Sequence, residues 1–433
     1  MKLFSRIVLL LLLVFPILSQ SQNPGQATIT EILRGKGFQP LPLLIPRPFL
    51  ETAEAGAAAD ELRGTLSADL NYSGLFEILD DSPYPPYRGT ADLTPWKISR
   101  AKYICLLKVG LSADQISVEA RFYDLQSEQL IVGKVYRWDR KFVRQIAHRF
   151  GDEILYRLWG IRGIFTSKIA FSSDRTGNRE LWLMDYDGYN QKQITISKSL
   201  NLSPDLSPDG KKVVYTTYRT TAEGTGQVLV VYSIYTGDKF TLFSRGTLNS
   251  APAWSHDGTR IAFTSNAGGN AEIYVIGADG TRPRQITFHR SIDTSPAWNP
   301  ASGQIAFTSD RSGNPMIYAM NEDGTNERRL TFVGEYNESA AWSPDGSKLA
   351  YVSRSGINFD IYVIDMGSNI VTRLTQNELS NENPYWSPDS RHIAFASNRT
   401  GKYQIWSTLY DGTKLRQLTR DGNNTSPSWA AGE

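Results

Sequence analysis

Residues Ser339–Thr375 contain the segments SAAWSPDGSKLAY, IYVID and TRLT, and this pattern decides the fold. The chain carries six copies of it, separated by steps of 44, 48, 44, 44 and 44 residues. A repeat of this length with short apolar stretches is typical of a four-stranded propeller blade, which must stack on its neighbours to bury its apolar faces. The aliphatic residues on which the copies align are Ile169, Val213, Ile261, Ile305, Leu349 and Ile393.

Each copy divides into four antiparallel strands. The innermost strand contains Pro-x-Trp, as in Pro296-Ala-Trp298, and an Asp-Gly turn leads from it to the IAF strand. A longer loop, S-[DN]-R-x-G-[NK], leads to the third strand, and a second Asp-Gly turn leads to an outer strand that ends in IT or LT. Asp and Gly suit these turns because Asp hydrogen-bonds its own backbone and Gly accepts a positive φ.

The two ends of the repeat predict how the ring closes. No Pro-x-Trp precedes Ile169, but Pro427-Ser-Trp429 stands close to the C-terminus. We therefore expect this last strand to become the innermost strand of the first blade, which would leave no open edge in the ring. The second copy is irregular, with Leu206 in place of Trp and extra residues at Arg219–Gly226. The sequence thus predicts an all-β six-bladed propeller over residues 161–433.

Residues 22–160 predict a small α/β domain with a mixed sheet and two helices. Helical spacing extends over Glu54–Tyr72, with Thr52 as the expected N-cap, and three strands follow between residues 103 and 138. Asp139 is expected to cap a second helix that ends near Leu158. One face of that helix is basic, and it is either a solvated face or a binding patch. Its residues are Lys141, Arg144, His148, Arg149 and Arg157.

Met1–Ser21 reads as a cleavable secretory signal, with Lys2 and Arg6 before an apolar run that is too short to span a membrane. Its removal would leave 44 basic and 44 acidic side chains, so the mature chain has no net charge that favours nucleic acid. These features predict a secreted protein without a membrane span. The single cysteine, Cys105, lies in an apolar run and is expected to be inert core.

The sequence shows no pattern of catalytic or metal-binding residues. Ser255-His256-Asp257 spells a triad, but adjacent residues in an Asp-Gly turn cannot meet in that geometry. The four histidines are scattered without metal-ligand spacing, and there is no G-x-S-x-G motif. We therefore predict a protein that is not an enzyme and has no cofactor or bound metal. A propeller hydrolase or lyase that uses channel carboxylates, and a glycan-binding propeller, remain the alternatives.

The loops that lead into the innermost strands carry a recurring polar set. All of them should lie on one face of the ring, where they would surround the mouth of its channel. They either bind a partner there or cap the start of each strand. The residues are Asn249, Ser250, Asp293, Thr294, Ser295, Asn337, Glu338, Asn381, Glu382, Asn383, Asn424 and Thr425.

Three further segments resemble the TolB family of the Tol-Pal system. They are A-D-L-x-x-S-G-x-F at Ala68–Phe76, D-E-I-L-Y-R-L-W-G-I-R-G at Asp152–Gly163 and D-Y-D-G-Y-N-Q at Asp185–Gln191. Pro-x-Trp-Ser-Pro-Asp-Gly is common to many propellers, whereas the D-Y-D-G-Y-N turn and the order of the two domains are specific. The resemblance covers essentially the whole mature chain.

This resemblance implies a non-enzymatic periplasmic adaptor. The propeller would bind the peptidoglycan-associated lipoprotein Pal, and the start of the mature chain would bind TolA. The protein would then support invagination of the outer membrane at cell division and its integrity, peripheral to that membrane through Pal. The segment that corresponds to the TolA-binding region has only one acidic residue, so an ordinary edge strand is an equal alternative. Its residues are Thr28, Ile29, Thr30, Glu31, Ile32 and Leu33.

Overall fold

The computed structural model describes residues 39–432, except residues 91, 222–223 and 377–378. Residues from Pro40 onward form one compact unit. The expected signal segment and the expected TolA-binding segment Thr28–Leu33 lie outside the described residues. Within the described residues, every helix is too short or too polar to cross a membrane.

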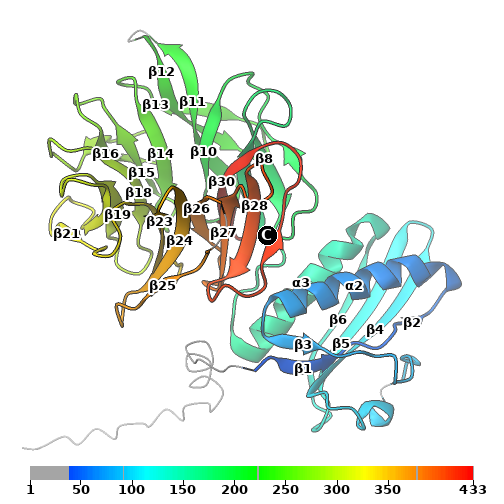
Figure 1. Ribbon diagram of the computed structural model, residues 1–433. Helices are drawn as coiled ribbons and strands as arrows, with labels where there is room; N and C mark the ends of the chain where they lie inside the picture. The colour runs from blue at the N-terminus through cyan, green and yellow to red at the C-terminus, as the bar shows by residue number, and fades with distance from the viewer. Residues whose placement is uncertain (1–38, 91, 222–223, 377–378, 433) are drawn as a thin grey trace, which may run out of the picture. The chain divides into compact units, whose positions relative to one another are not determined.

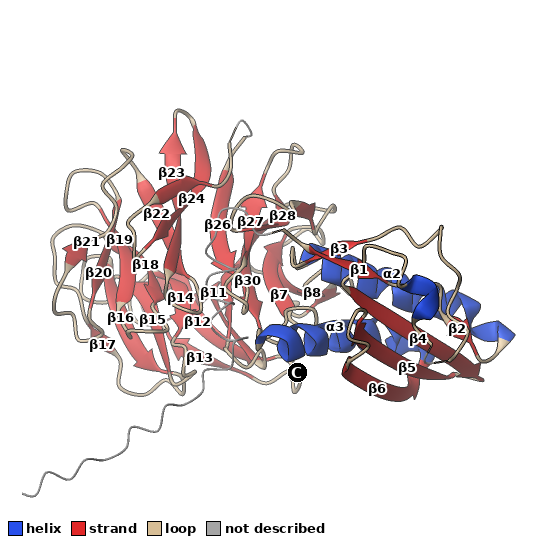
Figure 2. Ribbon diagram, turned by 90° about the horizontal axis from the view of Figure 1, so that it is seen from below, coloured by secondary structure: helices blue, strands red, loops and turns tan. Residues whose placement is uncertain are grey.

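The first part of the compact unit is an α/β domain with a mixed sheet (Figure 1). The sheet has the order β3-β1-β4-β5-β6; β1 runs parallel to β3 and β4, and β4, β5 and β6 are antiparallel. Helices α2 and α3 lie side by side on one face of this sheet (Figure 2). The elements are β1 Leu41–Leu44, β2 Phe49–Leu50, α2 Gly56–Tyr72, β3 Phe76–Ile78, β4 Tyr103–Ser112, β5 Gln115–Asp124, β6 Leu130–Asp139 and α3 Val143–Trp159.

The ends of the two helices differ from each other in how they are capped. Asp139 accepts a hydrogen bond from the Lys141 amide, at the start of a short 3-10 turn that leads into α3. Thr52 is not the N-cap of the first helix, contrary to the sequence prediction. Its hydroxyl donates to the carbonyl of Leu111 in the sheet, and a 3-10 turn at Ala53–Ala55 precedes α2 instead. Cys105 is fully buried, and this burial raises the pKa of its thiol, so it is structural.

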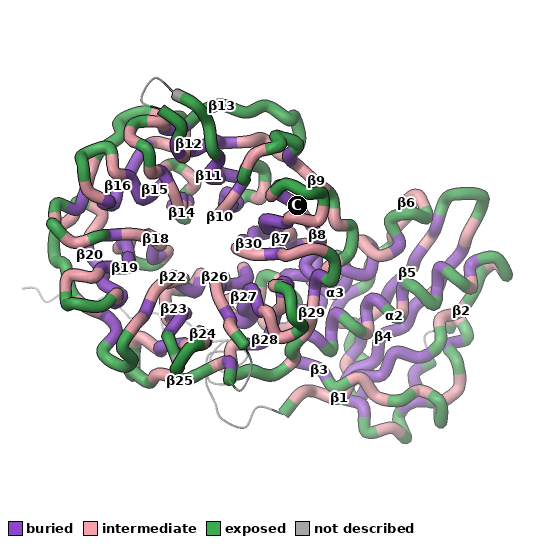
Figure 3. Tube along the Cα trace, turned by 45° about the horizontal axis from the view of Figure 1, so that its top comes forward, coloured by how far each residue is buried: buried purple, intermediate pink, exposed green. Residues whose placement is uncertain are grey.

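Six four-stranded antiparallel sheets make up the propeller, with strands β10, β14, β18, β22, β26 and β30 around its centre (Figure 3). The C-terminal strand β30 (Asn424–Ala430) is the innermost strand of the first blade, where it pairs with β7. The first blade continues with β7 Lys168–Ser173, β8 Glu180–Asp185 and β9 Lys192–Gln193. Blades two and three are β10 Asn201–Leu206, β11 Lys212–Thr221, β12 Gly224–Ser233 and β13 Lys239–Phe243, then β14 Asn249–Trp254, β15 Arg260–Ser265, β16 Glu272–Gly277 and β17 Arg284–Gln285.

Blades four to six repeat this arrangement. Their strands are β18 Asp293–Trp298, β19 Ile305–Ser309, β20 Met316–Met320, β21 Arg328–Arg329, β22 Asn337–Trp342, β23 Lys348–Ser355, β24 Asn358–Asp365, β25 Val371–Arg373, β26 Asn381–Trp386, β27 His392–Ser397, β28 Gln404–Leu409 and β29 Arg416–Gln417. In the second blade the extra residues lengthen the hairpin of β11 and β12, which stay paired along their whole length. The insertion therefore extends one hairpin of the second blade and leaves the ring of blades intact.

The repeated apolar residues pack between neighbouring blades rather than within one blade. Ile273 and Val275 of blade three, for example, belong to one buried cluster with Trp298 and Phe307 of blade four. Three tryptophans of the innermost strands also join neighbouring blades by hydrogen bonds. The Trp298 indole donates to the Ala253 carbonyl at 3.1 Å, and equivalent bonds join Trp254 to Asp205 and Trp386 to Ala341. Each blade is thus stabilised by the blade before it.

Candidate functional site: the loop face and channel of the propeller

The antiparallel order of the strands sorts the connections of each blade onto two faces. The Asp-Gly turns lie on one, which we call the turn face. The loops between the second and third strands, and those that lead into the next innermost strand, lie on the other, which we call the loop face. The polar residues predicted to bind a partner lie on the loop face, at the start of the innermost strands.

The first polar residue of each of these strands is fully buried. The Asn249 amide donates to the Gln227 and Arg245 carbonyls at 2.8 and 3.0 Å, and Arg311 makes a 2.8 Å ion pair with Asp293. Such residues hold neighbouring loops together and have no exposed surface for a partner. The predicted residues in this position are Asn249, Asp293, Asn337, Asn381 and Asn424, and for them the structure favours the capping explanation.

The other predicted residues are half-buried and remain accessible at the loop-face end of the strands. They are Ser250, Thr294, Ser295, Glu338, Glu382, Asn383 and Thr425. Tyr336 donates a 2.9 Å hydrogen bond to Glu338, and the Tyr403 hydroxyl donates to Glu382. Burial raises the pKa of Glu338, and the charge of Glu382 on the next blade raises it further, against the hydrogen bond from Tyr336. Two neighbouring blades thus present two carboxylates close to each other.

A second feature of the loop face is its exposed apolar side chains. Ile196, Phe288 and Phe332 directly follow the Thr of the IT or LT pair, just beyond an outer strand, and Val333 and Ile357 lie in loops of the same face. Their exposed fractions range from 60% to 87%. We call these five residues the apolar rim. The sequence analysis missed it, although a signal exists: three copies have an apolar residue after the IT or LT pair, where others have Gln376 or Arg420.

Every innermost strand contains a β-bulge, at the point where it lines the channel. The pairing with the second strand shifts register there in all six blades. The third residue of each strand has a left-handed φ of 46–54°, although none of the six is glycine. This conformation is costly for such residues, so its sixfold repetition shows that the bulge is a requirement of the ring. The residues are Ser203, Ala251, Ser295, Ser339, Asn383 and Ser426, and all line the channel.

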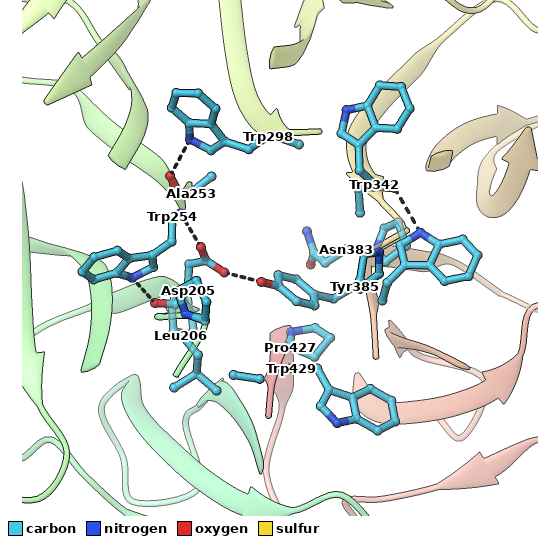
Figure 4. Close-up of a pocket in the computed structure, with 18 of the residues that line it drawn as sticks. Asp205, Leu206, Ala253, Trp254, Trp298, Trp342, Asn383, Tyr385, Pro427 and Trp429 are labelled. Atoms are coloured by element: carbon cyan, nitrogen blue, oxygen red, sulfur yellow. Dashed lines mark hydrogen bonds between the residues drawn. The ribbon is translucent and has the colours of Figure 1, made fainter. Parts of the chain in front are cut away.

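The channel holds a cavity of about 350 Å³ whose two sides differ (Figure 4). Alanines face it from blades three to five, at positions 253, 297 and 341. On the other side, Tyr385 of blade six reaches across to Asp205 of blade two and donates a 2.7 Å hydrogen bond. Ser428 of blade one and the Trp254 amide of blade three donate to the same carboxylate, at 3.0 and 2.7 Å. A hydrogen-bonded brace centred on Asp205 therefore joins blades six, one, two and three.

The brace predicts a pH-dependent effect of Tyr385→Phe. Burial raises the pKa of Asp205 to about 6, against the hydrogen bonds that lower it. Above that pH the carboxylate is charged, and removing a donor to a charged group costs about 1.5–3 kcal/mol. We expect Tyr385→Phe to destabilise the protein by this amount at pH 7.5 and by less at pH 5, measured by urea denaturation. An equal loss at both pH values would contradict the brace; Tyr156→Phe, which changes an exposed tyrosine, is the control.

A cluster of buried ionisable groups lies where the α/β domain contacts the first blade. His148 of α3 bonds Asp69 of α2 at 2.7 Å, and Tyr186 of the D-Y-D-G-Y-N turn donates to the same Asp69. The basic face of α3 is therefore not a wholly solvated face. Lys141, Arg149 and Arg157 are exposed, whereas Arg144 and His148 are engaged within the molecule.

The same cluster is the one group among the described residues whose ligand atoms could approach a common metal ion. These atoms belong to His148, Asp185 and Asp187 and lie within 4.8 Å of one another. However, Lys168 already pairs with Asp185, and Arg144 pairs with Asp187. Because both carboxylates already form ion pairs with these cations, we interpret the cluster as a network of ion pairs rather than as a metal site.

The fold and surfaces together define a two-domain β-propeller protein in which a small α/β domain precedes a closed six-bladed ring. Family models match both parts: the TolB amino-terminal domain over residues 31–131, and the TolB beta propeller domain over residues 155–361 and 337–433. The chain belongs to the TolB family. The predicted resemblance and the predicted fold class are confirmed.

Relatives and a solved structure agree with this assignment. The chain is 32% identical to the Tol-Pal system protein TolB of Desulfosudis oleivorans over 55% of this chain and 54% of that protein. It is 32% identical to that of Anaeromyxobacter dehalogenans, over 66% and 64%. The alignments thus span about half to two thirds of these relatives. The crystal structure of TolB from Acinetobacter baumannii has a TM-score of 0.78 and 28% identity, and the match covers 91% of this chain and 97% of that chain.

Proposed function

We propose that the protein is a non-enzymatic periplasmic scaffold of a Tol-Pal system. Its loop face binds the peptidoglycan-associated lipoprotein Pal, and its N-terminal segment binds TolA. Through Pal it acts at the outer membrane, where it supports invagination at cell division and integrity. Membership of the TolB family supports the system, and the surfaces of the propeller support the mode of action.

The observation that carries this proposal is the apolar rim. Phe288 and Phe332 are more than 70% exposed. By contrast, the apolar residues that recur in the IAF strands, such as Phe307, are buried between blades. Several large exposed apolar side chains on one face are typical of a protein–protein interaction surface, and aromatic residues contribute most to such binding. The rim therefore supplies the affinity for a folded partner such as the soluble domain of Pal.

The accessible polar residues of the loop face supply the specificity. We assign this role to Ser250, Thr294, Ser295, Glu338, Glu382, Asn383 and Thr425. Desolvated polar groups discriminate between partners, because a partner without matching donors leaves them unpaired. The buried residues of the same set hold the loops in place beneath the accessible ones. They are Asn249, Asp293, Asn337, Asn381 and Asn424.

TolA binding is assigned to the N-terminal segment with Thr28, Ile29, Thr30, Glu31, Ile32 and Leu33. The alternation of apolar and polar residues over Ala27–Thr30 suits an extended strand that is added to the edge of a partner sheet. This assignment rests on the family resemblance and on that pattern. Deleting residues 22–34 separates the two binding activities, because Pal binding does not depend on this segment in the proposal.

The test is binding of the full mature protein to the purified soluble domains of Pal and TolA, measured by calorimetry at moderate salt. We expect both to bind, and the protein lacking residues 22–34 to bind only Pal. Failure of Pal to bind would contradict the assignment of the loop face, and TolA binding by the shortened protein would contradict that of the segment.

The neighbouring carboxylates of Glu338 and Glu382 favour one alternative, a hydrolase or lyase, because one of them has a raised pKa. Turnover of a peptide or glycan substrate that Glu338→Gln abolishes would favour this alternative over the scaffold. The scaffold proposal predicts no turnover by the unmodified protein or by Glu338→Gln.

A further inference from the structure

The contact between the α/β domain and the first blade is built around one histidine. His148 is 2% exposed, and its Nδ1 atom lies 2.7 Å from Oδ2 of Asp69. Its Nε2 atom is buried without a hydrogen-bond partner and faces Oδ2 of Asp187, on the propeller, at 3.9 Å. The imidazole thus lies between a carboxylate of its own domain and a carboxylate of the propeller.

While Asp69 is ionised, the neutral and the protonated state of His148 have opposite effects on this contact. A neutral ring that donates from Nδ1 to Asp69 has a lone pair on Nε2, directed at the negative oxygen of Asp187. Protonation puts a hydrogen on Nε2 and turns a repulsive arrangement into an attractive one. Because both groups are buried, water cannot relieve the repulsion in the neutral state.

The charges around His148 also favour the protonated form. Asp69 of α2 and Asp185 and Asp187 of the first-blade turn are nearby acids, and Asp152 of α3 interacts with Asp69. The nearby cations are Arg144 of α3, Lys168 of β7 and Arg416 of β29, which lies over the Tyr186 ring. The charges of Asp69 and Asp187 act on His148 more strongly than that of Arg144.

We propose that His148 is a proton-dependent latch: protonated, it holds the α/β domain on the first blade by bridging Asp69 and Asp187, and its deprotonation loosens this contact. The latch involves two of the segments that mark the TolB family, since Asp69 lies in Ala68–Phe76 and Asp187 lies in the D-Y-D-G-Y-N turn. It does not depend on which partners the protein binds.

The direction of the pH dependence follows from the pKa of His148. Burial alone would lower this pKa, but the hydrogen bond and charge of Asp69, together with the charge of Asp187, raise it above its ordinary value, against the charge of Arg144. A histidine with a raised pKa in the folded protein contributes stability that is fully present below about pH 6.5, its unfolded value. This stability is lost as the pH rises through the folded value.

The test compares melting temperatures of the full-length protein, His148→Gln and the control His256→Gln between pH 5.5 and 8.5, at fixed ionic strength. His256 is exposed in an Asp-Gly turn, so its replacement removes a histidine without touching the latch. We expect the gap between the wild-type protein and His148→Gln to shrink by about 2–4 °C from pH 6 to pH 8.5. The control should follow the wild-type protein throughout. A gap that is independent of pH would overturn the latch.

Two measurements on the unmodified protein keep the proposal testable if His148→Gln does not fold. The first is the NMR titration of the His148 ring, which should have its midpoint above pH 6.5; a midpoint at or below this value overturns the proposal. The second is hydrogen exchange, corrected for the chemical effect of pH, which should increase between pH 6 and 8.5 in α3 and in Asp185–Asn190 but not in blade four. A uniform change would overturn it, as would a zinc-dependent rise in melting temperature.

Discussion

Removal of residues 425–433 should abolish the cooperative unfolding of the propeller. The deletion takes away nearly all of β30, and with it the backbone pairing to β7 at Ser428–Ala170 and Trp429–Ile169. It leaves the first blade with three strands and an exposed strand edge, and Asp205 without the hydrogen bond from Ser428. Calorimetry should show the propeller transition lost or broadened. The protein without residues 432–433, which keeps all of β30, is the matched control.

A single substitution measures the same closure in a protein that still folds. Trp429 is buried, and its indole donates a 2.7 Å hydrogen bond to Ser167 beside the first blade. Replacing a buried tryptophan with alanine typically costs about 3–5 kcal/mol. We expect this loss for Trp429→Ala in urea denaturation. An unchanged transition in either variant would mean that β30 is not required to close the ring.

The largest effect on binding is expected from the apolar rim. The double variant Phe288→Ser and Phe332→Ser should weaken Pal binding by about 10²- to 10³-fold, because a central aromatic side chain contributes about 2 kcal/mol or more. Both side chains are highly exposed, so stability should change by no more than about 0.5 kcal/mol each. Calorimetric titration measures the binding, and urea denaturation measures the stability.

The turn face provides a matched control for this experiment. Ile370 and Leu415 are also exposed apolar residues, but they lie between the third and the outer strand of their blades, on the opposite face of the ring. The double variant Ile370→Ser and Leu415→Ser should bind Pal as the unmodified protein does. Equal losses from the two double variants would show that the effect is not specific to the loop face.

The repeat predicted the blades well because its signal is redundant. An aliphatic residue recurs every 44 residues, with one step of 48, and Asp-Gly turns mark the same connections in most copies. No comparable signal marks the β-bulges, since Ser, Ala and Asn occupy a left-handed conformation that sequence normally assigns to glycine. The brace from Tyr385 to Asp205 was missed for a related reason: its two residues are 180 positions apart and lie on blades that are not adjacent.

The candidate site was harder to predict than the fold. The polar residues before each innermost strand are alike in sequence, but the ring buries the first of each set, as at Asn381, and leaves the second accessible, as at Glu382. The basic face of α3 also shows that a sequence pattern does not reveal which residues are buried. A helix pattern separates an apolar face from a polar one, but it cannot show that a second domain covers Arg144 and His148.

The position of the closing strand also bears on biogenesis. Because β30 is made of residues 424–430 and pairs with β7, the ring cannot close until residues far apart in the sequence have both been synthesised. Until then the first blade has no innermost strand, and its apolar residues lack part of their cover. The order of the strands along the chain thus makes closure of the ring a late step in the folding of the propeller.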